Sequence, residues 1–236
     1  MTAISLGRVS KTFPGGVHAL DSVDLEVGEG EFVAILGPSG CGKSTLLRIV
    51  AGLEEASSGR VETGDGIGVV FQTSNLLPWL TVEQNVGLGA QLKGRKVDTA
   101  PMLETLGLSA FARKYPHELS GGMRQRAALG QTLICEPRIV LLDEPFGALD
   151  ALTRDRLNVE LLRLWQDLRQ TVVLITHSIP EAVFLADRVV VMTGRPGAVA
   201  EEMRVEIPRP RDPAVTRGLP EFAEAVLHLS KLMGVV

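Results

Sequence analysis

A glycine-rich stretch carrying a lysine and a serine is the part of the sequence best suited to chemistry. Its residues are Gly37, Pro38, Ser39, Gly40, Cys41, Gly42, Lys43 and Ser44, followed by Thr45. They fit the pattern G-x-x-x-x-G-K-[ST], in which successive backbone N–H groups surround the phosphates of a nucleotide. Lys43 is expected to reach the β- and γ-phosphates, and Ser44 to ligate Mg²⁺. At average residue frequencies the pattern arises by accident in roughly 1% of chains of this length, so we predict a nucleotide site.

The residues on either side predict the strand and helix that a phosphate loop needs. Residues 31–36 form a mostly apolar run of strand length, and 43–53 have apolar residues at helical spacing with Gly52 near the end. A helix that starts at the loop directs the positive end of its dipole at the phosphates. The context therefore supports the pattern.

An acidic pair further along the chain suits the same chemistry. Asp143 follows the apolar run 139–142 and is expected to hold Mg²⁺. Glu144 is expected to polarise the water that attacks the γ-phosphorus. The alternative is an acidic pair that only marks the end of a strand.

A second glycine-rich segment, 119–123, has the features of an anion site at the start of a helix. Ser120 supplies a capping hydroxyl, and Gly121 and Gly122 follow it. By itself the segment is equally compatible with an ordinary helix cap.

The whole chain has the pattern of an α/β fold. Apolar segments of strand length occur at 4–9, 23–27, 31–36, 138–142, 171–176 and 188–192, and helical patterns at 43–53, from 81, at 98–106, 120–133, 154–169 and 181–186, and from 220. Residues 57–71 suggest a hairpin or meander added to the core sheet. Alternating strands and helices indicate a mainly parallel sheet covered on both faces. The phosphate loop, Asp143 and His177 each follow a strand, so we expect them to meet at the carboxyl ends.

Composition narrows the class of protein. Of 236 residues 45% are hydrophobic, which suits one large domain or a core with smaller subdomains. No apolar run approaches the length of a transmembrane helix, and we expect no signal peptide. Cys41 and Cys135 suggest neither a disulfide framework nor a metal site, and a reducing cytosolic compartment is expected. A net charge of −4 argues against a nucleic-acid surface.

The segment 119–126, Leu-Ser-Gly-Gly-Met-Arg-Gln-Arg, resembles the signature sequence of the ATP-binding-cassette (ABC) ATPases. The other motifs of that family occur in their usual order. Gln72 resembles its Q-loop glutamine, 143–145 its Walker B extension, 148–150 its D-loop and His177 its switch histidine. The resemblance covers about residues 3 to 195.

This resemblance implies roles that the pattern alone leaves open. Phe13 lies where the family stacks an aromatic ring on adenine, with burial in the core as its alternative. Gln72 and His177 join Glu144 as catalytic residues, and Gln72 also lies near Mg²⁺. The other residues that the family assigns to the bound ATP are Ser120, Gly121, Gly122 and Asp150.

The resemblance also implies a fold and its division. We expect a P-loop NTPase core with a mainly parallel sheet, an added antiparallel β-subdomain and an α-helical signature subdomain. Residues 1–207 would form one ATPase domain with the helical subdomain inserted at about 76–135, and 208–236 would be a Pro-rich linker and a C-terminal helix. The stretch 61–68 is shorter than in many members, so the β-subdomain is expected to be trimmed. Gly130-Gln131 replaces the usual Ala-Arg pair, which would loosen the helix after the signature.

Within the family, the segments 77–82, 145–154 and 195–197 are similar to those of importer ATPases for nitrate, sulfonate, taurine and related small solutes. They imply an ATPase subunit on the cytoplasmic face of the cell membrane. Its partners would be a second copy, arranged head to tail, membrane permease subunits and, indirectly, a solute-binding protein, with no nucleic acid.

Two other functions are weighed against this one. A non-transport ABC ATPase acting on nucleic acid or ribosomes usually has coiled-coil insertions, zinc ligands or two cassettes, none of which occurs in the sequence. A non-catalytic nucleotide sensor is disfavoured because Glu144 and His177 are both present.

Overall fold

The protein is described by a computed structural model that covers residues 1–147, 150–168 and 170–235. Its strands are β1 (Thr2–Thr12), β2 (His18–Gly28), β3 (Phe32–Leu36), β4 (Ser58–Thr63), β5 (Ile67–Val70), β6 (Ile139–Asp143), β7 (Thr171–Ile175), β8 (Arg188–Met192) and β9 (Val199–Arg204). Its α-helices are α1 (Lys43–Val50), α2 (Val82–Leu92), α3 (Ala100–Thr105), α4 (Gly121–Leu133), α5 (Ala151–Leu168), α6 (Ile179–Leu185), α7 (Pro213–Thr216) and α8 (Pro220–Leu232). Short 3₁₀ turns occupy Ser109–Phe111 and Pro116–Glu118.

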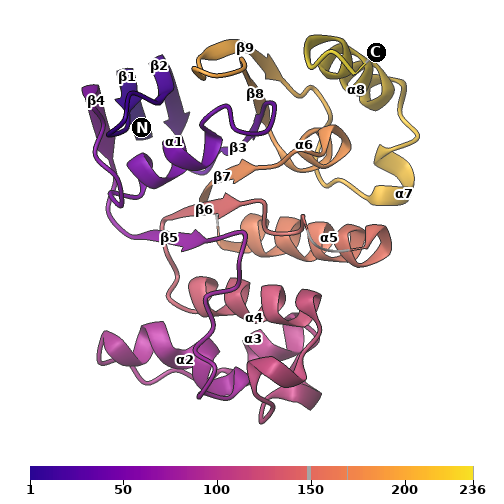
Figure 1. The fold of residues 1–236 in the computed structure, drawn as a ribbon. Helices are drawn as coiled ribbons and strands as arrows, with labels where there is room; N and C mark the ends of the chain where they lie inside the picture. Colours follow the sequence, from indigo (N-terminus) through magenta and orange to yellow (C-terminus); the bar gives the residue numbers. More distant parts are fainter. Residues whose placement is uncertain (148–149, 169, 236) are drawn as a thin grey trace.

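A six-stranded sheet in the order β5-β6-β7-β3-β8-β9 forms the centre of the molecule (Figure 1). The first five strands run parallel, and β9 pairs antiparallel with β8. Every residue of β3, β6 and β7 is buried, which is the pattern of parallel strands covered on both faces. The predicted parallel sheet is therefore confirmed.

The two faces of this sheet pack against different kinds of structure. Phe32, Ala34 and Leu36 of β3 lie in a core shared with α5, α6 and α8. The alternate residues Val33 and Ile35 lie in a second core, formed with α1 and the antiparallel sheet β2-β1-β4. Because successive side chains of a strand point to opposite faces, one short strand contributes to both cores.

The prediction of a hairpin or meander over 57–71 is wrong. β4 pairs antiparallel with β1 in the three-stranded sheet, whereas β5 pairs parallel with β6 at the edge of the six-stranded sheet. The turn at Gly64–Gly66 therefore carries the chain from one sheet to the other. Turn residues mark a break between strands, but they do not determine which strands pair.

Helices α2, α3 and α4 form a lobe of their own beneath the sheet (Figure 1). α2 begins at the predicted capping box, in which Thr81 accepts from the N–H of Gln84 and the Gln84 side chain accepts from the N–H of Thr81. Ser120 caps α4, as predicted. α4 runs unbroken through Gly130, where an added Cβ would lie 2.6 Å from Leu106 Cδ1. Gly130 therefore allows close helix packing, and the expected loosening is not seen.

The segment after β9 lies against the sheet domain. Arg211 is buried, and its guanidinium donates to the carbonyls of Val183, Phe184 and Ala186 at the end of α6. α8 begins at Pro220 and buries Phe222 and Leu229, as its apolar pattern predicted. None of the helices in the described ranges is both long and apolar enough to cross a lipid bilayer.

Candidate active site

The glycine-rich loop lies between the end of β3 and the start of α1, as its pattern predicted. Gly42 has φ of 102°, and a Cβ there would lie 2.6 Å from the carbonyl oxygen of Ala19. Only glycine fits this backbone conformation and this close approach. No side chain of the described residues caps the N-terminus of α1, so its first N–H groups remain available to an anion. The loop therefore fits the phosphate groups of ATP.

Lys43 and Ser44 begin this helix and face the middle of the loop. The Lys43 ammonium is buried and donates to the carbonyls of Gly37 at 2.7 Å and Pro38 at 3.0 Å. The Ser44 hydroxyl donates to Asp143 Oδ1 at 2.9 Å, which joins α1 to the end of β6. Burial raises the pKa of the Asp143 carboxyl, the Ser44 hydrogen bond opposes that rise, and the nearby Glu144 adds to it. A hydroxyl and a desolvated carboxylate are oxygen ligands of the kind that Mg²⁺ prefers, so the residues fit that ion.

Glu144 lies one residue beyond β6 and contacts two other predicted residues. Its Oε2 accepts a hydrogen bond from the Gln72 side-chain amide at 3.1 Å and lies 3.5 Å from His177 Nδ1. Gln72, Glu144 and His177 follow β5, β6 and β7, three neighbouring strands of the sheet. Glu144 has φ of 47°, which is uncommon for a residue other than glycine and is found preferentially at functional sites.

The other predicted site residues are Phe13, the signature segment and the D-loop. Phe13 is partly buried in the turn between β1 and β2, with the Lys11 ammonium 5.0 Å from its ring centroid. Ser120, Gly121 and Gly122 begin α4 in the helical lobe, apart from α1 and the phosphate loop (Figure 1). Of the predicted D-loop, residues 148 and 149 lie outside the described residues, and Asp150 accepts from the N–H of Thr153.

The structure also shows two positioning contacts that sequence reasoning missed. The buried Gln125 of α4 donates to the carbonyl of Phe71, directly before Gln72. The hydroxyl of Thr176, directly before His177, donates to the buried carboxylate of Glu181 on α6. Burial raises the pKa of Glu181, against hydrogen bonds from Thr176 and Asn158. In the sequence, only one feature of Glu181 could have indicated this contact: it is a charged residue on the apolar face of a short helical segment.

Known proteins with similar sequences and structures agree with this geometry. The ABC transporter family profile matches residues 20–147. The nitrate import ATP-binding protein NrtD of Synechocystis sp. is 42% identical, over 97% of this chain and 92% of its own length. The aliphatic sulfonates import ATP-binding protein SsuB of Bacillus licheniformis is 46% identical, over 89% and 87%.

A similar fold has been solved in a nucleotide-bound state. The chain resembles the ATP-binding cassette MJ0796 in a dimeric, post-hydrolysis structure bound to ADP and Pi, with a TM-score of 0.77 and 34% identity. That likeness covers 86% of this chain and 99% of the cassette chain.

Proposed function

The chain belongs to the ABC transporter family and is an ATP-hydrolysing ATP-binding subunit of its importer group, and we propose that it drives the uptake of a small solute through a partner permease. Its relatives named for nitrate and aliphatic sulfonates favour a small anion of that kind as the solute. The chain would act from the cytoplasmic face of the membrane. The non-transport alternative gains no support from these relatives.

We propose that Glu144 is the general base of ATP hydrolysis. Its carboxylate lies beside the Ser44–Asp143 pair and contacts both Gln72 and His177. Ser44, Asp143 and Gln72 would hold Mg²⁺, which would neutralise charge on the phosphates. Glu144 would accept a proton from the attacking water, and His177 would hold the γ-phosphate in place. This cluster at one sheet edge is the observation that carries the proposal.

Two copies would form each complete site. The phosphate loop and the signature segment lie on different lobes, so within one chain the γ-phosphate would be exposed on one side (Figure 1). A second copy placed head to tail would bring its Ser120, Gly121 and Gly122 to that side, where a helix N-terminus binds anions. Hydrolysis would then remove the contact that keeps the two copies together, which converts the ATP cycle into motion.

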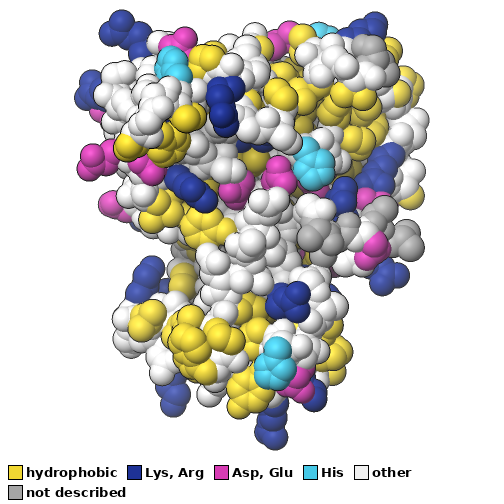
Figure 2. Space-filling model, in the orientation of Figure 1, with side chains coloured by type: hydrophobic (Ala, Val, Ile, Leu, Met, Phe, Trp, Pro, Cys, Tyr) yellow, Lys and Arg dark blue, Asp and Glu magenta, His cyan; other side chains and the backbone are white. Residues whose placement is uncertain are grey.

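The helical lobe offers the surface for a permease. Hydrophobic side chains gather on this lobe (Figure 2). The Trp79 side chain is 69% exposed and lies just before α2, in the segment 76–80 that follows Gln72. Exposed tryptophans are frequent anchors of protein interfaces, so this segment would transmit the state of the ATP site to the membrane subunit.

Co-expression with the candidate permease subunits tests the proposal. The wild-type chain should co-purify with membranes, and Trp79→Asp should lose this association while keeping its basal ATPase activity. Leu92→Asp is the matched control, because Leu92 is 79% exposed on the same lobe but at the far end of α2. Membrane association that survives Trp79→Asp, or that Leu92→Asp abolishes equally, would contradict the proposed interface.

A further inference from the structure

The turn between β8 and β9, residues 193–198, has a shape fixed by its own hydrogen bonds. The N–H of Thr193 donates to the carbonyl of Ala198, and the N–H of Ala198 donates to the Thr193 hydroxyl oxygen, both at 2.9 Å. The single proton of the same hydroxyl is within hydrogen-bond distance of two carbonyls of the turn, those of Gly194 at 3.1 Å and Pro196 at 3.2 Å. These hydrogen bonds between the two ends of the turn restrict its conformation and so hold the residues at its tip in place.

This turn is attached to β2, next to the nucleotide loop. The N–H of Gly197 donates to the carbonyl of Ala19, and the carbonyl of Gly197 accepts from the N–H of Asp21, both at 2.9 Å. The carbonyl of Ala19 is also the atom that an added Cβ on Gly42 would meet. The turn, the start of β2 and the phosphate loop therefore meet at one point.

The turn touches the phosphate loop without any space between them. A Cβ added to Gly197 would lie 1.9 Å from the carbonyl oxygen of Cys41, which is far inside contact distance. It would also lie 2.9 Å from the end of the Met192 side chain. By contrast, an added Cβ on Gly194, in the same turn, meets nothing within 4 Å. Gly197 is therefore the residue through which the turn packs against the phosphate loop.

Arg195 extends from this turn over the loop. Its Nε donates to the carbonyl of Gly40 at 3.2 Å, and its side chain is otherwise exposed. Among residues 1–147, 150–168 and 170–235, no carboxylate forms an ion pair with this guanidinium. Gly40 has φ of 76°, in the left-handed region. The loop thus carries a positive charge in addition to Lys43.

We infer that Arg195 is a positioning residue for nucleotide binding, which holds the phosphate loop through Gly40 and strengthens the binding of nucleoside di- and triphosphates. A hydrogen bond from a charged donor is stronger than a neutral one, so it stabilises the left-handed conformation of Gly40. An uncompensated cation beside the loop also attracts a polyanion. The inference rests on the nucleotide site described above.

The test is the dissociation constant for ADP, measured by titration calorimetry at low and high ionic strength. Arg195→Gln should raise this constant about 3- to 10-fold, which is the net size of one hydrogen bond made by an exposed side chain. It should also lessen the salt dependence, whereas Arg195→Lys should bind with intermediate affinity. Arg204→Gln is the matched control, because Arg204 ends β9 and has the same charge but lies away from the loop. The melting temperature of each variant should stay near that of the wild type.

Two glycine variants test the contact itself. Gly197→Ala should weaken ADP binding more than Arg195→Gln does, and Gly194→Ala should not weaken it. ADP binding at wild-type strength by Arg195→Gln would overturn the inference, even if Gly197→Ala fails to fold.

Lys43→Ala separates this inference from the site on which it rests. If Lys43→Ala loses ADP while Arg195→Gln keeps it, only the role of Arg195 is wrong. If neither variant loses ADP, the phosphate loop itself has been misassigned.

Discussion

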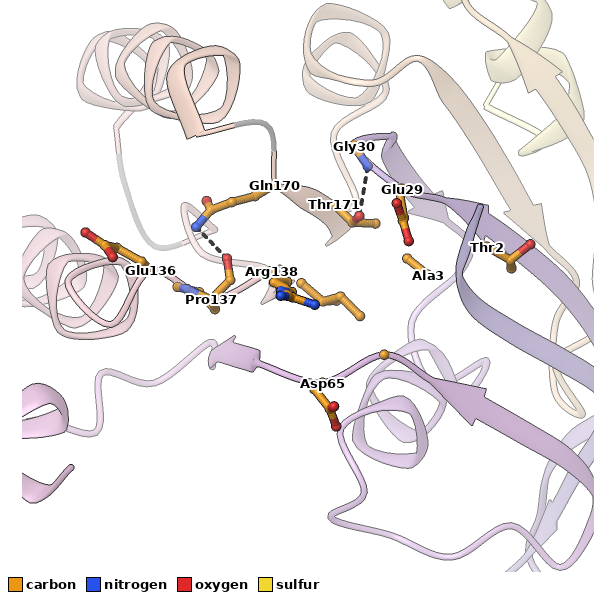
Figure 3. Close-up of a pocket in the computed structure, with 12 residues that line it drawn as sticks. Thr2, Ala3, Glu29, Gly30, Asp65, Glu136, Pro137, Arg138, Gln170 and Thr171 are labelled. Atoms are coloured by element: carbon orange, nitrogen blue, oxygen red, sulfur yellow. Dashed lines mark hydrogen bonds between the residues drawn. The ribbon is translucent and has the colours of Figure 1, made fainter.

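The parallel strands of the six-stranded sheet begin along one edge of the sheet and end along the opposite one, here called the amino edge and the carboxyl edge. Both edges carry polar groups, but these groups have different partners. A cavity of about 440 Å³ lies at the amino ends of the strands (Figure 3). There the Gln170 amide donates to the carbonyl of Pro137 at 2.8 Å, and the Thr171 hydroxyl accepts from the N–H of Gly30 at 3.0 Å. These side chains satisfy backbone groups, and they stabilise the ends of strands.

At the carboxyl edge the side chains contact one another instead. Ser44 pairs with Asp143, and Gln72 and His177 share the carboxylate of Glu144. The first N–H groups of α1 also remain available to an anion there. The comparison teaches that the volume of a cavity does not locate the chemistry. Reactive groups that meet from separate strands, next to backbone donors without a cap, do locate it.

The largest expected effect is on the carboxyl edge. Glu144→Gln keeps the shape of the side chain but removes the base, so kcat for ATP hydrolysis should fall about 10²- to 10⁴-fold while ATP still binds. Because the γ-phosphate then persists, we expect an ATP-dependent dimer on gel filtration. Steady-state ATPase assays check the first expectation, and full activity in this variant would exclude Glu144 as the base.

A smaller effect, on thermal stability, is expected from a substitution of Glu181, which lies on α6 next to the carboxyl edge. Burial raises the pKa of its carboxyl, so the ionised form is penalised in the folded protein once the pH exceeds that pKa. The penalty disappears at lower pH, where the carboxyl is protonated. Glu181→Gln should therefore raise the melting temperature at pH 8, by about 2–4 °C for each kcal/mol relieved. The gain should shrink as the pH is lowered toward the ordinary pKa of a glutamate carboxyl, and a gain that is the same at pH 8 and at that lower pH would contradict this explanation.

The smallest effect is expected at the amino edge. Arg138 is exposed on the wall of the cavity (Figure 3), whereas the Ser44–Asp143 pair lies at the opposite, carboxyl ends of the strands. Arg138→Ala should change stability by about 0.5 kcal/mol or less and leave kcat and KM for ATP unaltered. Thermal melts and ATPase assays on one preparation check this. A large loss of activity would show that the two edges are not functionally distinct.

The sequence predicted the carboxyl edge well, for a simple physical reason. Asp143, Glu144 and His177 each follow an apolar strand, and parallel strands bring their carboxyl ends together. The caps at Thr81 and Ser120 were predicted because hydroxyl side chains bond to the N–H groups of the next turn.

What the sequence did not predict depends on partners remote along the chain. β4 pairs with β1 and β5 pairs with β6, so the two strands join different sheets. Both partners lie far along the sequence from the turn that connects β4 to β5. β9 was missed because its apolar residues are few and only half-buried at the edge of the sheet. The contacts of Gln125 with Phe71 and of Arg195 with Gly40 join segments that no local pattern relates.

The most direct test of the central claim mixes two inactive variants, Lys43→Ala and Ser120→Arg. If each site combines the phosphate loop of one copy with the signature of the other, a mixed dimer has one site with both lesions and one intact site. In an equal mixture half of the dimers are mixed, so we expect about a quarter of the wild-type ATPase activity to return. If mixed dimers form but no activity returns, or if an isolated monomer hydrolyses ATP at the wild-type rate, the head-to-tail site is contradicted.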